Sequence, residues 1–414
     1  MRSGAWTVAV GAVVAIVGAG ACNSVGKGSG AATAGRPAHL AYVQTQAGLA
    51  GVDALGGRVL FQTPGAVASP GWTTLVRSAP QLGGTRLYAI DTATGRTRWV
   101  GKVRAGLAVR VVATDGRRIA LTEPAPARAA SVAGYPSGRA TTTLEVVGPA
   151  RPEPRRYELA GNFEPEAFSL DGRALFVIEF SPPLAPDRYR VRSLDLGKGT
   201  VGDVASPDKD LQQDMRGSPT MQVPAPDGGR VYTLYSLRDT DGHMRSFVHV
   251  LSLGGRWAHC VDLPDEFSAP GSTMAVAPDG RHLVVVQGLS GDVAEIDTRA
   301  LRVEGTGSLG SPVKGPVALT RDGRLFVVDD SDKVLVVGRL GAMPRALDGV
   351  ASGALGLALT RDGASLLVAG AGRLTVVDTA SGAVRHELPL VNVRSLGWPS
   401  PLLDSGAGHI ECAC

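Results

Sequence analysis

Aromatic residues are scarce in this sequence of 414 residues, at 5%, although 44% of the residues are hydrophobic. Without many large rings the core must be built from Val, Leu, Ala and Ile, which favours many short β-strands over a few large helices. Charged residues make up only 19% of the chain. This composition excludes collagen, coiled coil and charged disorder, so we expect a folded, mainly β protein.

An excess of one charge is also missing, because 42 basic residues stand against 38 acidic ones and both kinds are spread along the chain. Nucleic-acid binding requires a concentrated basic surface, so we exclude nucleic acid as a partner.

The sequence contains no G-x-S-x-G elbow, no Walker-type glycine loop, no H-E-x-x-H and no C-x-x-C pair. We therefore assign no catalytic residue, no metal ligand and no cofactor.

The N-terminus indicates export. Arg2 is followed by an uncharged, mostly small and apolar run from Ala5 to Ala21, which predicts a signal peptide over residues 1–22. The small residues before Cys22 resemble the box recognised by lipoprotein signal peptidase, although Ala19 stands where Leu is usual. The resemblance implies lipidation of Cys22 and a membrane anchor, with an ordinary secretory signal or an uncleaved anchor as alternatives. Residues 23–38 are rich in Gly, Ser and Ala and predict a flexible tether.

A recurring phrase organises the rest of the chain: an apolar strand, a turn containing Asp-Gly, and a second apolar strand. It occurs six times, around Asp115, Asp171, Asp227, Asp279, Asp322 and Asp362. Asp suits a tight reversal because its side chain caps the turn, and Gly adopts the positive φ. The spacings of 56, 56, 52, 43 and 40 residues bracket the length of a four-stranded propeller blade.

A second phrase, a strand ending in Asp followed by Thr or Ser and then Gly, recurs at 87–99 and 374–390. We name the four strands of each unit A to D. Complete units start near residues 65, 107, 165, 219, 272, 314 and 354. In the first of these, residues 69–77 stand for a degenerate A–B segment. The N-terminal piece, residues 39–61, supplies strands B, C and D of one more unit, and 393–399 supplies strand A.

We therefore predict an all-β fold, a β-propeller of eight four-stranded blades over residues 39–399. Strands from the two ends of the chain close the ring, which removes the exposed edge of an open array. Seven blades is the alternative if the irregular region 65–160 holds one blade fewer. Residues 400–414 form a C-terminal tail with a Cys-x-Cys motif.

These motifs resemble known families. The Asp-Gly-Arg turn before a Val/Leu strand is similar to YVTN and WD-repeat-like bacterial propellers, and the segment from Ala89 to Trp99 matches the A-x-D-x-x-T-G-x-x-x-W signature of quinoprotein-like propellers. The resemblance implies the fold but leaves the function open, since propellers host binding, assembly and several chemistries. Quinone-binding members carry the tryptophan motif in many blades and a vicinal Cys pair, so the resemblance implies no cofactor here.

Long connections predict the functional face. In a four-stranded blade the A–B and C–D turns share one face, and the B–C and D–A connections share the other. The insertions run over Glu123–Ala140, Ser181–Asp187, Asp203–Ser218 and Arg238–His243, and all are B–C or D–A connections. Drifted, solvated loops are the alternative. We predict that a ligand docks on this rim at Tyr135, Arg139, Arg188, Tyr189, Met215, Arg216 and His243.

Two functions follow from this architecture. The first is a membrane-anchored binding or scaffold module in the cell envelope, without covalent chemistry, whose partner is a protein, a peptide or an envelope glycan. The second is a hydrolase or lactonase with a site in the central channel. A binding module predicts an apolar, aromatic-rimmed surface on the loop face, whereas a hydrolase predicts convergent carboxylates or a bound ion in the channel.

The cysteines and the acidic loops leave further alternatives. If Cys22 is lipidated, then Cys260, Cys412 and Cys414 remain, and a disulfide from Cys260 to either tail cysteine would hold the tail across one face. The spacing of His409, Cys412 and Cys414 also permits soft metal coordination, and an unstructured tail is the third possibility. Acidic loop residues could bind calcium or could be ordinary turn residues: Asp208, Asp210, Asp214, Asp239 and Asp241.

Overall fold

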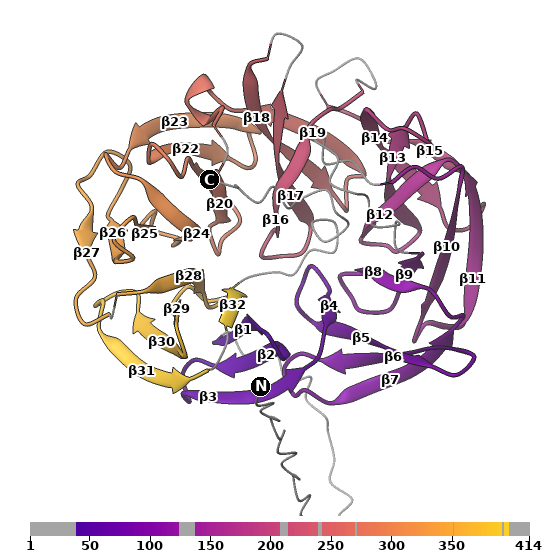
Figure 1. Cartoon of the computed structure of the whole chain (residues 1–414), viewed down its shortest axis with the longest axis horizontal. Coiled ribbons are helices and arrows are strands. Elements are labelled where there is room, and N and C mark those ends of the chain that lie inside the picture. The colour runs from indigo at the N-terminus through magenta and orange to yellow at the C-terminus, as the bar shows by residue number, and fades with distance from the viewer. Residues whose placement is uncertain are drawn as a thin grey trace, which may run out of the picture. The chain divides into compact units, whose positions relative to one another are not determined.

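The computed structural model describes residues 39–123, 137–207, 214–238, 242–269, 271–350, 352–390 and 393–396. These segments belong to one contact unit, Arg36–Cys414. They form eight four-stranded antiparallel sheets, each of which is one blade of a β-propeller (Figure 1). The number of blades is thus eight, and the seven-bladed alternative is wrong. Within the segments given above, no helix has both the length and the apolar character needed to cross a bilayer.

Blades 1 to 4 come from the first half of the chain and one C-terminal strand. Blade 1 contains β32 (Val393–Leu396), β1 (Leu40–Thr45), β2 (Gly48–Asp53) and β3 (Arg58–Thr63). Blade 2 contains β4 (Ala66–Ala68), β5 (Thr74–Gln81), β6 (Gly84–Asp91) and β7 (Thr97–Val103). Blade 3 contains β8 (Ala108–Val112), β9 (Ile119–Thr122), β10 (Thr141–Gly148) and β11 (Arg151–Ala160). Blade 4 contains β12 (Asn162–Phe168), β13 (Ala174–Ser181), β14 (Arg188–Asp195) and β15 (Val201–Asp203).

Blades 5 to 8 follow in chain order. Blade 5 contains β16 (Ser218–Pro224), β17 (Arg230–Arg238), β18 (Met244–Ser252) and β19 (Trp257–Asp262), and a 3-10 turn, η1 (Asp265–Phe267), comes next. Blade 6 contains β20 (Thr273–Val276), β21 (His282–Val286), β22 (Asp292–Asp297) and β23 (Arg302–Ser308). Blade 7 contains β24 (Val313–Leu319), β25 (Leu325–Asp329), β26 (Val334–Val337) and β27 (Arg345–Ala346). Blade 8 contains β28 (Ala354–Leu359), β29 (Ser365–Gly370), β30 (Arg373–Asp378) and β31 (Val384–Pro389).

The ring closes as the sequence predicts, through a sheet that both ends of the chain share. Strand β32 pairs antiparallel with β1, so that Val43 faces Leu396 and Thr45 faces Val393. In Figure 1 the yellow β32 lies beside the indigo β1. Leu396 and Val393 are buried in one apolar cluster with residues of β1, β2, β29 and β30. This sheet removes the free edge that strand β1 would otherwise present.

The Asp-Gly turns have the predicted chemistry. The glycine after each of the six aspartates has positive φ, between 64° and 81°. In five of the turns the Asp side chain accepts a hydrogen bond from the backbone N–H two residues later, at 2.8–3.0 Å. A Cβ on Gly116 would lie 2.0 Å from Thr74 Oγ1, so this turn also needs glycine for space. The repeated motif therefore specifies the A–B connection of each blade.

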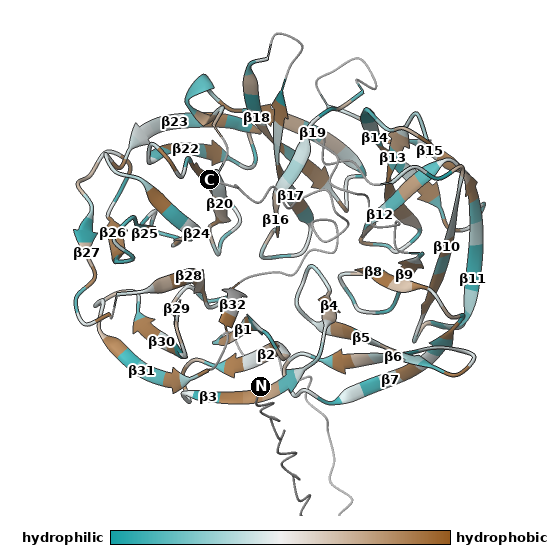
Figure 2. Cartoon of the chain, viewed as in Figure 1, coloured by the Kyte–Doolittle hydropathy of each residue, from teal (hydrophilic) through white to brown (hydrophobic). Residues whose placement is uncertain are grey.

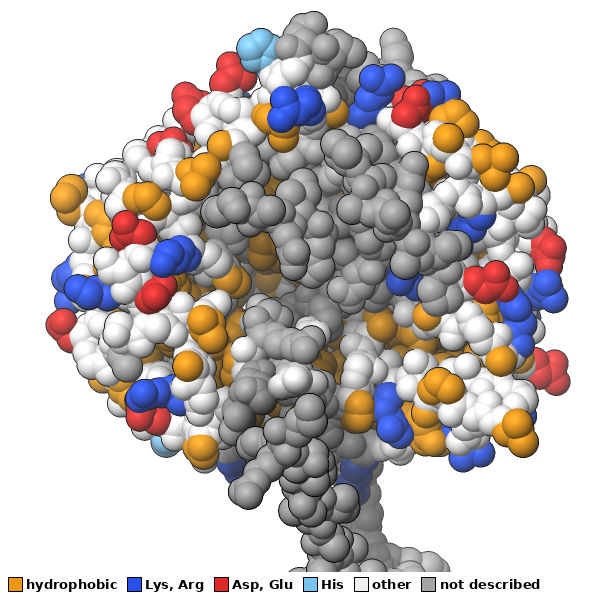
Figure 3. All heavy atoms as spheres, viewed as in Figure 1, with side chains coloured by type: hydrophobic (Ala, Val, Ile, Leu, Met, Phe, Trp, Pro, Cys, Tyr) orange, Lys and Arg blue, Asp and Glu red, His pale blue; other side chains and the backbone are white. Residues whose placement is uncertain are grey.

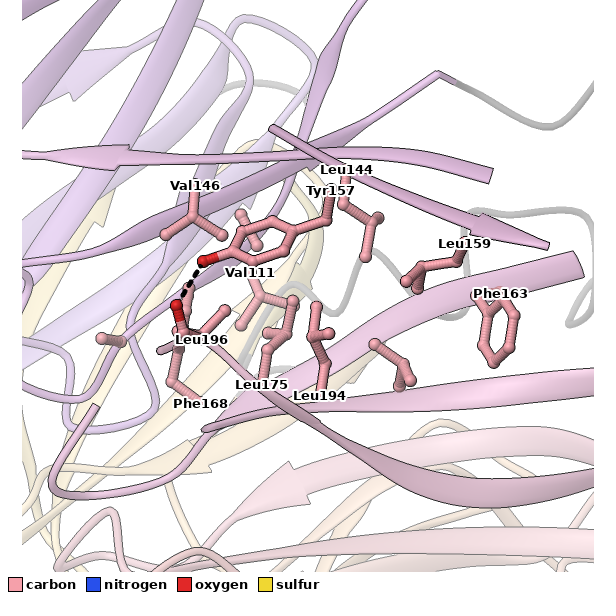
Figure 4. Packing of buried hydrophobic residues seen from close by; sticks show 13 residues of the cluster. Val111, Leu144, Val146, Tyr157, Leu159, Phe163, Phe168, Leu175, Leu194 and Leu196 are labelled. Atoms are coloured by element: carbon pink, nitrogen blue, oxygen red, sulfur yellow. Dashed lines mark hydrogen bonds between the residues drawn. The ribbon is translucent and has the colours of Figure 1, made fainter. Parts of the chain in front are cut away.

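The core lies between adjacent blades. Strand residues alternate between apolar and polar along many of the strands, which gives the alternating colours of Figure 2. Figure 4 shows one such cluster between blades 3 and 4, where Tyr157 from β11 packs over Leu175 and Leu194. The hydroxyl of Tyr157 donates a hydrogen bond to the carbonyl of Leu196 at 2.8 Å (Figure 4). Blade-to-blade packing of this kind fixes the strand ends relative to one another.

Candidate functional site

The four long connections leave the same ends of their blades. They join β9 to β10, β13 to β14, β15 to β16 and β17 to β18, and all are B–C or D–A connections. Because consecutive strands in each sheet are antiparallel, these connections lie at the strand ends opposite the Asp-Gly turns. We call this side the loop face. Among the segments that the structure describes, 137–140, 182–187, 204–207, 214–217 and 242–243 belong to these connections.

Arg139 joins blade 3 to blade 4. Its backbone N–H donates to the carbonyl of Pro183 at 2.9 Å. Its guanidinium donates to Asn162 Oδ1 at 3.0 Å and to Glu164 Oε1 at 2.7 Å. Glu164 is almost completely buried, and Arg110 Nε lies 3.3 Å from its second carboxylate oxygen. Since the Arg139 side chain is only 14% exposed, its main contacts are within the protein, where it holds the end of the first insertion in place.

The segment 214–216 extends the outer edge of blade 4. The backbone N–H groups of Tyr189 and Met215 each donate to the other residue's carbonyl, at 2.9 and 2.8 Å. The carboxylate of Asp214 forms an ion pair with Arg188, whose Nε lies 2.9 Å from Oδ2, and accepts a hydrogen bond from Arg190. Asp214 is one of the acidic residues that the sequence analysis considered as calcium ligands. In the structure its carboxylate is paired with these two guanidinium groups instead. Arg216 follows with an exposed side chain.

Tyr189 lies inside this rim and not on its surface. Its ring is 2% exposed and stacks on Tyr235, with 5.4 Å between the ring centroids. Tyr235 stacks in turn on Phe247, with 5.2 Å between the centroids. Tyr189 therefore does not form an aromatic binding surface. It packs inside the protein, beneath the rim. Of the predicted binding residues, Arg216 and His243 are exposed, whereas Arg188 is half-buried.

A cavity of about 360 Å³ lies beside this segment, between blades 4 and 5. It is lined by residues of β14, β15, β17, β18 and β19 and of the segments that follow β15 and β19. Its charged lining residues are of both signs: Arg190, Arg192, Asp203, Asp214, Arg216, Arg245, Asp262 and Asp265. The lining of the cavity thus contains charged side chains of both signs. It also contains a thioether, an imidazole and a thiol, from Met215, His249 and Cys260.

The interior side chains lie close together. Cys260 Sγ is 3.6 Å from His249 Nδ1 and 3.8 Å from Met215 Sδ. His249 is 2% exposed, and within the described part of the chain its Nε2 has no hydrogen-bond partner. Burial, together with the nearby His259, lowers the pKa of His249 to about 4. The imidazole is therefore neutral at physiological pH and can accept at one ring nitrogen.

A second cavity, of about 240 Å³, occupies the central channel. It is lined by residues of blades 1, 2, 5, 6, 7 and 8 and is mostly apolar, with Met221, Met274 and a stacked pair of rings, Tyr42 and Trp72, whose centroids are 4.3 Å apart. Arg361 is the one charged residue in the described lining. No carboxylate belongs to that described lining, so the arrangement expected for a channel hydrolase is not found there.

One buried acid stands apart from both cavities. Glu166 lies at a bulge in β12, between Pro165 and Ala167, and is 5% exposed. Neither carboxylate oxygen has a hydrogen-bond partner in the described structure. Burial raises the pKa of Glu166 to about 8, so the carboxyl group is protonated over most of the physiological range.

Several predicted residues lie outside the described segments: Cys22, Tyr135, Asp208, Asp210, Asp239, Asp241, His409, Cys412 and Cys414. Lipidation and the pairing of Cys260 with a tail cysteine thus stay predictions, as do the boundaries of the signal peptide, tether and tail. Among the residues with described positions, no group of three or more His, Cys, Asp or Glu could hold a metal ion. In the view of Figure 3, acidic and basic side chains are interspersed over the described surface.

Sequence reasoning missed His249 and Glu166. A signal for the first exists, because the turn around Gly254 and Gly255 sets the register of the β18–β19 hairpin. That register places His249 directly opposite Cys260. Glu166 gives no comparable signal, since its burial depends on a strand bulge and on the packing of neighbouring blades.

Comparison with known proteins adds little beyond the architecture. No family model matches the chain, and no curated protein matches it. Among solved structures, the dihydro-heme d1 dehydrogenase NirN is 15% identical, over 89% of this chain and 76% of that one, with a TM-score of 0.49. BamB from Moraxella catarrhalis is 15% identical, over 77% and 88% of the two chains, with a TM-score of 0.41. The periplasmic gluconolactonase PpgL from Pseudomonas aeruginosa is 21% identical, over 78% and 97%, with a TM-score of 0.39. At these levels the likeness carries no functional argument.

Proposed function

We propose that this protein is an extracytoplasmic β-propeller, anchored to the membrane through lipidated Cys22, that binds a protein partner through its loop face. We propose no covalent chemistry for it. A peptide or an envelope glycan is the alternative ligand on the same surface. The single observation behind the proposal is that the two longest connections, 123–140 and 204–217, lie at one end of three consecutive blades together with two shorter insertions, whereas the Asp-Gly turns at the other end are uniformly short.

The internal contacts of the rim support this proposal. Arg139 and the 214–216 segment are held by hydrogen bonds and ion pairs to strands of blade 4, so these described parts of the rim are fixed in position before a partner arrives. A preorganised surface loses less conformational entropy on binding. The exposed arginine and histidine side chains, Arg216 and His243, are of types that make charge-assisted hydrogen bonds at protein interfaces.

The binding proposal also fits the described lining of the central cavity. A lactone or ester hydrolase needs an acid, a base or a metal directed at the scissile bond. The described lining of the central cavity offers Arg361 and apolar side chains instead. A channel enzyme of the lactonase type is the second candidate, and hydrolysis of a lactone by the purified full chain, retained when the rim is altered, would favour it.

The test is capture of partners from an envelope extract by the tagged full chain. Arg216→Glu reverses an exposed charge on the rim, and a second variant shortens the 123–140 insertion. Arg321→Glu is the matched control, because Arg321 is an exposed arginine in an Asp-Gly turn at the opposite strand ends. We expect both rim variants to lose a partner that wild type and Arg321→Glu retain. Equal recovery of every partner by all four proteins would refute the rim as the binding surface.

The anchor is tested separately. Lipidation of Cys22 predicts that the wild-type chain sediments with membranes and that Cys22→Ala is released into the soluble fraction. Membrane association of Cys22→Ala that survives high salt would contradict the lipid anchor while leaving the binding surface untouched.

A further inference from the structure

In the cavity between blades 4 and 5, Cys260 lies close to two other side chains, Met215 and His249. Cys260 is 45 residues from Met215 and 11 residues from His249. Its sulfur lies 3.8 Å from the thioether sulfur and 3.6 Å from the imidazole nitrogen Nδ1. All three residues line the same cavity.

These separations match two bonds to a single soft metal ion. With metal–sulfur bonds of about 2.3 Å, metal–nitrogen bonds of about 2.0 Å and a near-tetrahedral angle, a sulfur and a nitrogen ligand lie about 3.5 Å apart. Two sulfur ligands lie about 3.8 Å apart under the same assumptions. Cys260 is therefore already spaced to share an ion with Met215 and to share one with His249.

The donor set selects the metal. Thiolate and thioether sulfur are soft ligands that favour copper(I), whereas a thioether contributes little to zinc binding and nothing to calcium or magnesium binding. We infer that Met215, His249 and Cys260 form a three-ligand site for copper(I) in the cavity between blades 4 and 5. Binding releases the thiol proton of Cys260 to solvent and forms one copper–thiolate bond, with no change of oxidation state.

The ligand positions are fixed by backbone structure. His249 and Cys260 are directly paired residues of the β18–β19 hairpin. Met215 is held by two backbone hydrogen bonds to Tyr189 of β14. The site thus bridges two blades, which gives the 214–216 segment a role in closing it.

Access and burial also fit an ion site. His249 is fully buried, whereas Met215 and Cys260 are half-buried at the wall of the 360 Å³ cavity, through which an ion can enter. The Nε2 atom of His249 is buried without a hydrogen-bond partner in the described structure, so the ring is available to rotate or to shift its proton when Nδ1 binds metal.

The experiment measures copper(I) affinity by competition with a chromophoric copper(I) chelator under anaerobic, reducing conditions. The starting protein is the full chain with Cys22, Cys412 and Cys414 changed to Ser, so that copper binding to other cysteines does not contribute. We expect one equivalent of copper(I) to bind. Cys260→Ser should lower the affinity by on the order of 100-fold, because it removes the thiolate, and Met215→Leu by about 10-fold, because it removes a weaker thioether ligand of similar volume.

Met221→Leu is the matched control, since Met221 lines the central cavity instead. It should bind copper(I) like the starting protein, and X-ray absorption of the copper-loaded protein should show two sulfur ligands and one nitrogen ligand. Circular dichroism checks that each variant is folded. Copper(I) affinity that is unchanged in folded Cys260→Ser, or zinc binding as tight as copper(I) binding, would overturn the inference and leave the three residues as a packed thiol–imidazole–thioether contact.

Discussion

The buried carboxyl group of Glu166 predicts an unusual dependence of stability on pH. Both oxygens lack hydrogen-bond partners in the described structure, and the side chain is 5% exposed. Burial raises its pKa from the ordinary 4.5 to about 8. The folded protein therefore keeps a proton that the unfolded chain loses above pH 4.5. Glu166→Gln replaces this acid with a neutral amide of nearly the same shape, which has no proton to lose.

The sign and size of the effect follow from the linkage between proton binding and folding. Each pKa unit corresponds to about 1.4 kcal/mol, so the difference between 4.5 and about 8 corresponds to about 5 kcal/mol. This stability is fully present below pH 4.5 and is lost as pH rises toward 8, because the unfolded state binds fewer protons over that interval. Above pH 8 the loss levels off.

Urea unfolding of wild type and Glu166→Gln at intervals from pH 4.5 to pH 9 measures this effect. We expect the free energy of unfolding of wild type, relative to Glu166→Gln, to fall continuously with pH by about 5 kcal/mol. The two proteins can also differ by a pH-independent amount of unfolding free energy. That amount does not affect the test, because the prediction concerns how the difference changes with pH. Glu158→Gln changes an exposed glutamate of β11 and should give a curve parallel to wild type. Parallel curves for Glu166→Gln as well would refute the reasoning.

Three further substitutions test the ring, the rim and the turns by urea unfolding. Leu396→Ala removes a buried side chain from the closing strand and should cost about 2–4 kcal/mol, whereas Leu355→Ala, at a leucine that is 55% exposed, should change stability by less than about 0.5 kcal/mol. Arg139→Met deprives the buried Glu164 carboxylate of one of its two cationic partners and should cost about 3 kcal/mol; a cost below about 1 kcal/mol would contradict the proposed anchoring. Gly116→Ala forces a side chain into a left-handed turn in contact with a neighbouring blade and should cost more than about 1 kcal/mol; a neutral result would contradict the need for glycine there.

The sequence predicts the architecture well because each blade carries its own local signal. Asp279 and Gly280, for example, form a turn that depends on one side-chain hydrogen bond and one positive φ, both of which are properties of the turn itself. The shared blade was also predictable, since the N-terminal piece lacks a strand A and the C-terminal piece supplies one. Repetition adds these weak signals into a strong one.

The site is harder to predict because it depends on contacts between repeats. Tyr189 stands next to an insertion and was expected at the surface, but the 214–216 segment and the ring of Tyr235 cover it. The proximity of Met215 to Cys260 depends on how that segment crosses from blade 4 to blade 5. Such contacts follow from packing between blades, and no local pattern in the sequence encodes them.

Closure of the ring by β1 and β32 is the central claim, because the assignment of the four insertions to a common face depends on it. The most direct measurement is disulfide formation between Val43→Cys and Leu396→Cys in a full chain whose four native cysteines are changed to Ser. These positions are directly opposite in the β1–β32 pair, a separation that a disulfide can bridge. We expect quantitative intramolecular cross-linking under mild oxidation, and none when Val250→Cys replaces Val43→Cys. Failure of the 43–396 pair to cross-link in the folded protein would contradict the closed ring and, with it, the common loop face.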